Sequence, residues 1–171
     1  MRKYQCMQTI WAPWRMAYIL SEKQNACVFC EKSQPAANDG ENLVLFRGKA
    51  AFALLNIYPY NTGHLMIAPY AHVSSLTALS QEQIGALFHL TQQCEAVLTQ
   101  AMRPEGFNIG VNLGKAAGAG IAEHLHVHIV PRWNGDANYM STLADVRVIP
   151  QRLADTYALL RGYFDGLRHE C

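Results

Sequence analysis

Short runs of apolar residues alternate with turn-forming residues along most of the chain from residue 42 onward. Runs of this length, bounded by glycine, proline or asparagine, are typical of β-strands. The connections Gly48-Lys49 and 58–63 are rich in turn-forming residues, and the first is short enough for a tight hairpin. The pattern therefore predicts five strands, at 42–47, 51–57, 64–68, 107–113 and 124–130.

Two longer segments have the periodicity of amphipathic helices. Ser80 and Gln83 form a capping-box pattern, and the apolar residues that follow recur at helical spacing until Arg103-Pro104. A second helix is expected at about 151–167, where Leu153, Tyr157, Leu160 and Phe164 fall on one face. Strands that cluster around one long helix favour the α+β class. We expect an antiparallel sheet of about five strands, with the long helix and the C-terminal helix on one side.

Composition restricts the classes of protein to which the chain can belong. Half of the 171 residues are hydrophobic and 16% are charged, which excludes disordered and fibrous chains and fits a single domain, 1–171. The 14 basic and 13 acidic residues nearly balance, so we expect neither DNA nor RNA as a partner, whereas a small nucleotide remains compatible.

The cellular location follows from hydropathy. No run of about 18 apolar residues is present, so we expect no membrane association. The first twenty residues are interrupted by Arg15, and we expect no signal peptide. The five cysteines show no regular disulfide framework, so the cytoplasm is the expected compartment.

Three histidines alternate along the last predicted strand, in His124-Leu-His126-Val-His128. Because strand side chains alternate between faces, the three imidazoles share one face and the intervening apolar residues share the other. Such a row can chelate a metal, or one imidazole can act as a nucleophile that its neighbours orient. Spacing alone leaves both interpretations open.

A glycine-rich segment, 114–120, precedes the histidines. Glycines allow backbone N–H groups to approach an anion closely, and Lys115 adds positive charge. The alternative is a flexible connection between strands. Beside a row of histidines we favour a phosphate site, with Lys115, Gly118 and Gly120 as candidate nucleotide contacts.

A second motif, Cys27-Val-Phe-Cys30, is compatible with a structural, a redox or a metal-binding role. A tetrahedral Cys₂His₂ site would require two histidines in addition. His72 lies eight residues after His64 and is one candidate.

The run from His124 to Pro131-Arg132 resembles the signature of the histidine-triad family. Three further segments are similar to strands of that family, and the resemblance extends from about residue 27 to 132, with N- and C-terminal extensions; the segments are 52–56, 62–67 and 107–112. Residues 11–15, with Trp11 and Trp14, and residues 131–136 resemble a bacterial branch described as diadenosine-tetraphosphate phosphorylase-like or hydrolase-like.

The resemblance implies an enzyme that transfers a nucleotidyl group at an α-phosphate. His126 would attack phosphorus and form a nucleotidyl-histidine intermediate, His128 would assist the leaving group, and His64 would support them. Asn56 matches a ribose-binding position and Asn112 a phosphate-side position. The implied substrate is a dinucleoside polyphosphate such as diadenosine tri- or tetraphosphate, with water or phosphate as acceptor.

The same resemblance implies a structural zinc held by Cys27, Cys30, His72 and His124. A homodimer and a substrate-bound Mg²⁺ are also expected. One position departs from the family pattern: Ile121 stands where many members carry Ser or Thr, so its side chain cannot hydrogen-bond to phosphate.

Other functions remain alternatives. A nucleoside phosphoramidate hydrolase would share the histidine chemistry, a nucleotide-binding regulatory protein would show little turnover, and a metal-dependent enzyme would use the histidines as ligands. Tyr58 and Tyr60 flank Pro59 in a turn, where packing and a role in the nucleotide pocket are both open.

Overall fold

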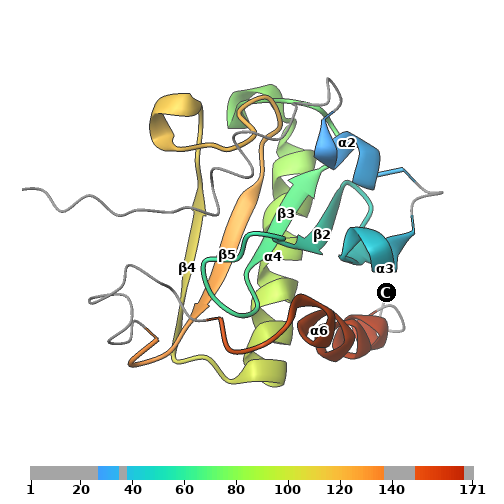
Figure 1. Cartoon of the computed structure of the whole chain (residues 1–171). Coiled ribbons are helices and arrows are strands. Elements are labelled where there is room, and N and C mark those ends of the chain that lie inside the picture. Colours follow the sequence, from blue (N-terminus) through green and yellow to red (C-terminus); the bar gives the residue numbers. More distant parts are fainter. Residues whose placement is uncertain (1–26, 35–37, 137–148, 168–171) are drawn as a thin grey trace, which may run out of the picture.

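The structure is a computed structural model, and it describes residues 27–34, 38–136 and 149–167. The expectation for the first twenty residues and the motif at 11–15 lie outside this part of the chain. The sheet has five strands in the order β1-β2-β3-β5-β4, and every neighbouring pair is antiparallel (Figure 1). The strands are β1 (Val44–Arg47), β2 (Ala51–Leu55), β3 (Leu65–Pro69), β4 (Gly106–Val111) and β5 (Val127–Arg132). The α+β prediction with five antiparallel strands is confirmed.

The helices include the two that the sequence predicts. They are α2 (Val28–Lys32), α3 (Asp39–Asn42), α4 (Gln81–Met102) and α6 (Leu153–Leu167), with 3₁₀ turns η1 (Leu76–Ala78) and η2 (Lys115–Ala117). The capping box at the start of α4 is present, because Ser80 accepts from the Gln83 N–H and Gln83 accepts from the Ser80 N–H. Within the described ranges, no helix combines the length and the apolar character needed to cross a membrane.

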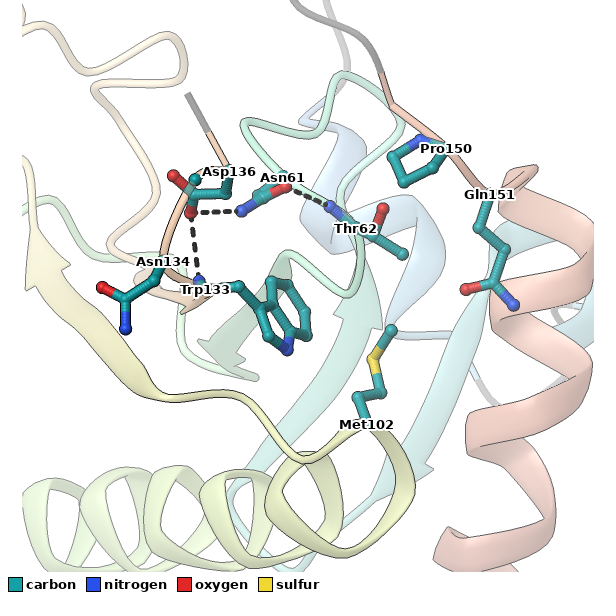
Figure 2. Close-up of a pocket in the computed structure, with 9 residues that line it drawn as sticks. Asn61, Thr62, Met102, Trp133, Asn134, Asp136, Pro150 and Gln151 are labelled. Carbon is teal, nitrogen blue, oxygen red and sulfur yellow. Dashed lines mark hydrogen bonds between the residues drawn. The ribbon is translucent and has the colours of Figure 1, made fainter. Parts of the chain in front are cut away.

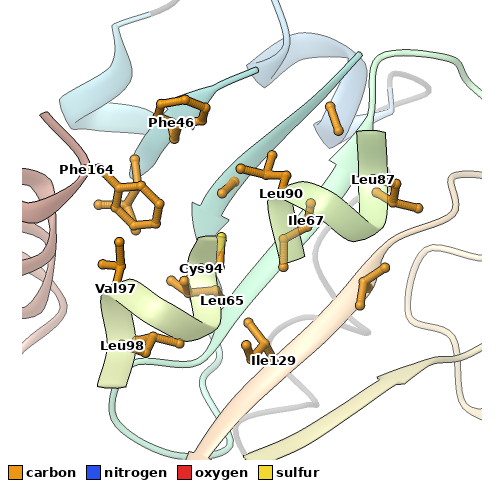
Figure 3. Packing of buried hydrophobic residues seen from close by; sticks show 14 of the residues in the cluster. Phe46, Leu65, Ile67, Leu87, Leu90, Cys94, Val97, Leu98, Ile129 and Phe164 are labelled. Atoms are coloured by element: carbon orange, nitrogen blue, oxygen red, sulfur yellow. The ribbon is translucent and has the colours of Figure 1, made fainter. Parts of the chain in front are cut away.

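The main hydrophobic core lies between one face of the sheet and the two long helices (Figure 3). Leu65 and Ile67 of β3 and Ile129 of β5 point into this core, and all three are fully buried. The inner face of α4 contributes Cys94, which is also fully buried, and Phe164 of α6 packs on Phe46. This face supplies most of the apolar burial that holds the fold together.

The opposite face of the sheet is also covered. Phe29 of α2 is fully buried against Phe52 and Leu54 of β2, in a second and smaller apolar cluster. Successive β2 side chains therefore enter different clusters, and every residue of the strand is buried. The expectation that the helices lie on one side holds for α4 and α6 but not for α2, since the apolar second face of β2 needs its own cover.

The last predicted strand begins later than expected, at Val127 instead of His124. The reason is a change of hydrogen-bond partner. The His124 side chain donates from Nε2 to the carbonyl oxygen of Pro69 at 2.9 Å, and the Leu125 N–H donates to the Val73 carbonyl. Next to the first histidine, a bond from the His124 side chain and a bond to the loop carbonyl of Val73 thus replace the hydrogen-bond ladder between β3 and β5.

Gly63 is expected to be intolerant of a side chain. Its φ is +77°, and an added Cβ would lie 2.7 Å from the Met102 sulfur and 3.2 Å from Pro131. Left-handed backbone strain and overpacking together should make Gly63→Ala lose about 2 kcal/mol or more of unfolding free energy, measured by urea denaturation. Gly85→Ala is the matched control: it lies exposed on α4 with nothing near the new methyl group, and should gain about 0.5–1 kcal/mol. Equal effects of the two substitutions would show that the Gly63 backbone and its close neighbours impose no constraint.

Candidate active site

Three histidines meet on the face of the sheet opposite the main core. His128 lies on β5 in register with Met66 of β3, and His64 immediately precedes β3, two residues before Met66, so both imidazoles lie on the same side of the sheet. The ring centroids of His64 and His128 are 5.2 Å apart, and those of His126 and His128 are 4.8 Å apart. The structure therefore brings the three predicted catalytic residues into one cluster.

Backbone groups determine which nitrogen of His64 and His128 carries the proton. The Tyr60 N–H donates to Nδ1 of His64 at 3.1 Å, so a neutral His64 ring must carry its proton on Nε2. That Nε2 lies 2.9 Å from Nδ1 of His128, which must then be the acceptor. His128 consequently carries its own proton on Nε2.

His126 has the opposite arrangement. Its Nδ1 lies 2.8 Å from the His124 carbonyl oxygen, and because a carbonyl can only accept, Nδ1 must be the protonated nitrogen. Nε2 of His126 therefore bears a lone pair. Two adjacent imidazoles thus offer a lone pair on one ring and an N–H donor on the other, which suits a nucleophile next to a hydrogen-bond donor for a departing oxygen.

Burial keeps these imidazoles neutral. Burial, followed by the proximity of His128 and His126, lowers the pKa of His64 to about 3. Burial and then His126 lower the pKa of His128 to about 4. For His126 burial lowers the pKa, and the hydrogen bond to the His124 carbonyl partly opposes it. The tautomers of neutral imidazole are therefore the relevant ones near pH 7.

A second cluster joins Cys27, Cys30, His72 and His124, whose ligand atoms all lie within 4.8 Å of one another. Nδ1 of His124 is 3.3 Å from the Cys27 sulfur and 3.6 Å from the Cys30 sulfur, and Nδ1 of His72 is 3.2 Å from the Cys30 sulfur. Around a tetrahedral zinc, the usual bond lengths place sulfur and nitrogen ligands about 3.5 Å apart. The three sulfur–nitrogen separations are close to this value, so the cluster is compatible with a tetrahedral metal.

Phe29 connects the two clusters. It lies between the two cysteines in sequence, and its ring centroid is 4.8 Å from that of His126 and 5.1 Å from that of His124. His124 is itself oriented by the Pro69 carbonyl, which accepts from Nε2 and leaves Nδ1 directed toward the cysteines. The cysteine-bearing helix α2 therefore packs directly on the candidate nucleophile.

The remaining predicted contacts are more dispersed. Asn56 is half-buried next to the histidines: its Oδ1 accepts from the Tyr58 N–H, and its Nδ2 lies 3.3 Å from Nδ1 of His64. Asn112 follows β4 directly and is half-buried. The predicted contacts of the glycine-rich segment are exposed and lie at or near η2, between β4 and the histidines; they are Lys115, Gly118 and Gly120.

The cavity in Figure 2 lies at the other end of β5. It has a volume of about 420 Å³, and none of the predicted site residues lines it. Asn61 is the structural centre of this region, since its Nδ2 donates to the Pro131 carbonyl and to Asp136. Asp136 in turn forms an ion pair with Arg132. These bonds fix the turn that precedes His64 against the end of β5.

Sequence reasoning missed three contributors to the site. Phe29 was a spacer in the Cys27–Cys30 motif, the Tyr60 amide was part of a turn, and the Pro69 carbonyl carries no sequence signal. The apolar character of Phe29 between two polar ligands is a signal that could have been used. Backbone donors and acceptors are invisible in sequence because every residue has them.

Comparison with known proteins agrees with this geometry. The HIT domain family matches residues 38–135 of the chain. An AP-4-A phosphorylase from Mycobacterium tuberculosis is 45% identical over 161 residues, covering 90% of this chain and 83% of the relative. A bis(5'-adenosyl)-triphosphatase from Dictyostelium discoideum is 30% identical over 89 residues, covering 52% of this chain and 59% of that protein.

Among solved structures, a zinc-bound histidine triad family protein from Mycobacterium smegmatis is similar, with a TM-score of 0.67 and 27% sequence identity. The match covers 85% of this chain and 98% of that one. Sequence, fold and the clustered histidines agree, and the chain belongs to the HIT domain family.

Proposed function

We propose that the protein is an enzyme that cleaves dinucleoside polyphosphates, such as diadenosine tri- or tetraphosphate, by transferring a nucleotidyl group through His126. The observation that carries the proposal is the complementary pair of tautomers: a lone pair on Nε2 of His126 beside an N–H on Nε2 of His128. The names of the Mycobacterium tuberculosis and Dictyostelium discoideum relatives support this class of substrate.

In the first step, Nε2 of His126 attacks the α-phosphorus and forms an N–P bond while the P–O bond to the departing phosphate breaks. The departing oxygen leaves as part of a phosphate anion and accepts a hydrogen bond from the Nε2–H of His128, and the His124 carbonyl stabilises the positive imidazole that develops at His126. In the second step, an oxygen of water or an unprotonated oxygen of inorganic phosphate attacks phosphorus, the N–P bond breaks, and His126 leaves as a neutral imidazole; when water attacks, its proton passes to solvent. A phosphate acceptor would be consistent with the name of the 45% identical relative.

His64 acts through His128 in this scheme. Its Nε2–H donates to Nδ1 of His128 and fixes the His128 ring with its own N–H directed away from His64. The Tyr60 amide, which donates to Nδ1 of His64, keeps that orientation from reversing. We further propose that Asn56 contacts ribose, that Asn112, Lys115, Gly118 and Gly120 contact phosphate, and that Mg²⁺ accompanies the substrate.

We also propose that the Cys₂His₂ cluster holds zinc. Two sulfurs and two imidazole nitrogens at these separations complete a tetrahedral shell and leave no position for a substrate, so the ion would be structural. Bound zinc would tie α2 to the segment before β5. The zinc-bound neighbour from Mycobacterium smegmatis supports this assignment.

The oligomeric state and location are proposals as well. β4 is an edge strand of the sheet, and Ile109 and Leu113, on and just beyond it, are each 43% exposed. An exposed edge with apolar side chains supports a homodimer. We propose a cytoplasmic protein that binds neither DNA nor RNA, which is consistent with its nearly neutral charge.

His126→Ala should abolish turnover. Incubation with diadenosine tetraphosphate should give AMP and ATP if water is the acceptor, or ADP and ATP when inorganic phosphate is present and is the acceptor. Loss of the nucleophile should lower the rate by about three decades or more. The exposed His89 on α4 provides the control, because His89→Ala should leave the rate unchanged. No cleavage by the wild-type protein under either condition, or a His126→Ala rate within tenfold of wild type, would refute the mechanism.

Metal analysis of protein purified without chelator or a metal-affinity column should find one zinc per chain. Cys27→Ser combined with Cys30→Ser should lose the metal, and its main effect should be on stability. The melting temperature should fall, whereas the molecules that remain folded should keep most of their turnover. Cys94→Ala is the control: this buried thiol lies outside the cluster, so it should cost stability and retain zinc. Substoichiometric zinc with unchanged stability in the double variant would contradict the assignment.

Stability should decrease as the pH falls from 7 to 5. The pKa values of His64 and His128 lie near 3 and 4 in the folded protein, whereas imidazole in an unfolded chain titrates near pH 6.5. Between these values the unfolded chain binds more protons, so each histidine costs roughly 1–2 kcal/mol of unfolding free energy at pH 5. Urea denaturation of His64→Gln should show a smaller loss over this interval than the wild type. An identical loss in both proteins would argue against a buried, neutral His64.

A further inference from the structure

The ring of Tyr60 packs on two imidazoles of the active site and is also open to solvent. Its centroid is 4.8 Å from that of His64 and 6.1 Å from that of His128, with interplanar angles of 29° and 27°. The residue is nevertheless 42% exposed. Tyr58, on the same turn between β2 and β3, is 38% exposed. Large aromatic side chains left this exposed beside a catalytic cluster offer a flat surface on which a planar group can stack.

Tyr60 lies beside the imidazole that serves the departing group. The two ends of the reacting pair have different aromatic neighbours: buried Phe29 packs on His126, whereas exposed Tyr60 stacks along His64 toward His128. In the proposed reaction the Nε2–H of His128 hydrogen-bonds to the departing oxygen. The departing phosphate chain therefore starts at an imidazole whose ring centroid is 6.1 Å from that of Tyr60.

The departing half of a dinucleoside polyphosphate consists of a phosphate chain that ends in a second nucleoside. The phosphates gain nothing from an aromatic surface, whereas a nucleobase stacks on one whatever its identity. We propose that Tyr60 is a stacking platform for the nucleobase of the departing half, so that the enzyme prefers a dinucleotide to a mononucleoside polyphosphate. This inference rests on the proposed function and assigns a second base subsite to the same active site.

Two substrates separate this role from a general effect on catalysis. Diadenosine tetraphosphate and adenosine 5'-tetraphosphate present the same reacting half, but the first releases ATP and the second releases triphosphate without a base. Tyr60→Leu should lower the ratio of the two kcat/KM values about tenfold, mostly through KM for diadenosine tetraphosphate. Tyr60→Phe retains the ring and should keep the wild-type ratio. Phe88→Leu, on an exposed aromatic of α4, is the matched control and should also keep it.

Three results would overturn the proposal. Equal losses on both substrates in Tyr60→Leu would mean that Tyr60 only orients the histidines. A loss in Tyr60→Phe as large as in Tyr60→Leu would assign the effect to the hydroxyl group. A wild type that does not prefer the dinucleotide would show that the departing base is not bound.

Binding measurements keep the inference distinct from the proposed function. In the His126→Ala background, the dissociation constants of the two nucleotides can be compared by calorimetry with and without Tyr60→Leu. A preference for diadenosine tetraphosphate that disappears with the tyrosine would support the platform even if the wild type cleaved neither compound. In that case the proposed function would fail while the subsite remained. Equal dissociation constants with Tyr60 present would refute the subsite.

Discussion

The chemistry of this protein depends on main-chain groups that decide which nitrogen of each imidazole carries a proton. The Tyr60 amide places the proton of His64 on Nε2, and His64 in turn places the proton of His128 on Nε2. The His124 carbonyl places the proton of His126 on Nδ1. A neutral imidazole can carry its proton on either ring nitrogen. The wrong choice on one ring would set two donors or two acceptors against each other in a hydrogen bond. Three short hydrogen bonds remove that ambiguity, and burial keeps the rings neutral so that the assignment holds near pH 7.

The two faces of the sheet have separate tasks. The face under α4 and α6 carries the large apolar core, and its side chains serve packing alone. The opposite face carries the histidines and the cysteine–histidine cluster, covered in part by α2. Alternation along β5 assigns Val127 and Ile129 to the first face and His128 to the second. A substitution that weakens the core is therefore expected to act on the chemistry only through the strand backbone.

The candidate metal cluster and the candidate nucleophile form one structural unit. His124 contributes its ring to the cluster and its carbonyl to His126, while Phe29 lies between two candidate ligands and packs on the His126 ring. The nucleophile is thus held at one nitrogen and on one ring face by residues that the cluster itself fixes. A closed metal site at this position would chiefly stabilise the segment that carries His126, with no ligand position needed for substrate.

The sequence by itself determined the order of the five strands and the two long helices, the sharing of one face by alternating histidines, and the capping box of α4, because these depend on local periodicity and on side-chain chemistry. Only the tertiary structure decided that His64 reaches His128, that His72 and His124 meet cysteines about 40 to 100 residues away, and that α2 covers the second face. The late start of β5 was equally beyond the sequence, because it accompanies a bond from the His124 ring to the Pro69 carbonyl and one from the Leu125 N–H to the Val73 carbonyl. Such contacts depend on which distant segments become neighbours and on backbone groups that all residues share, and local periodicity specifies neither.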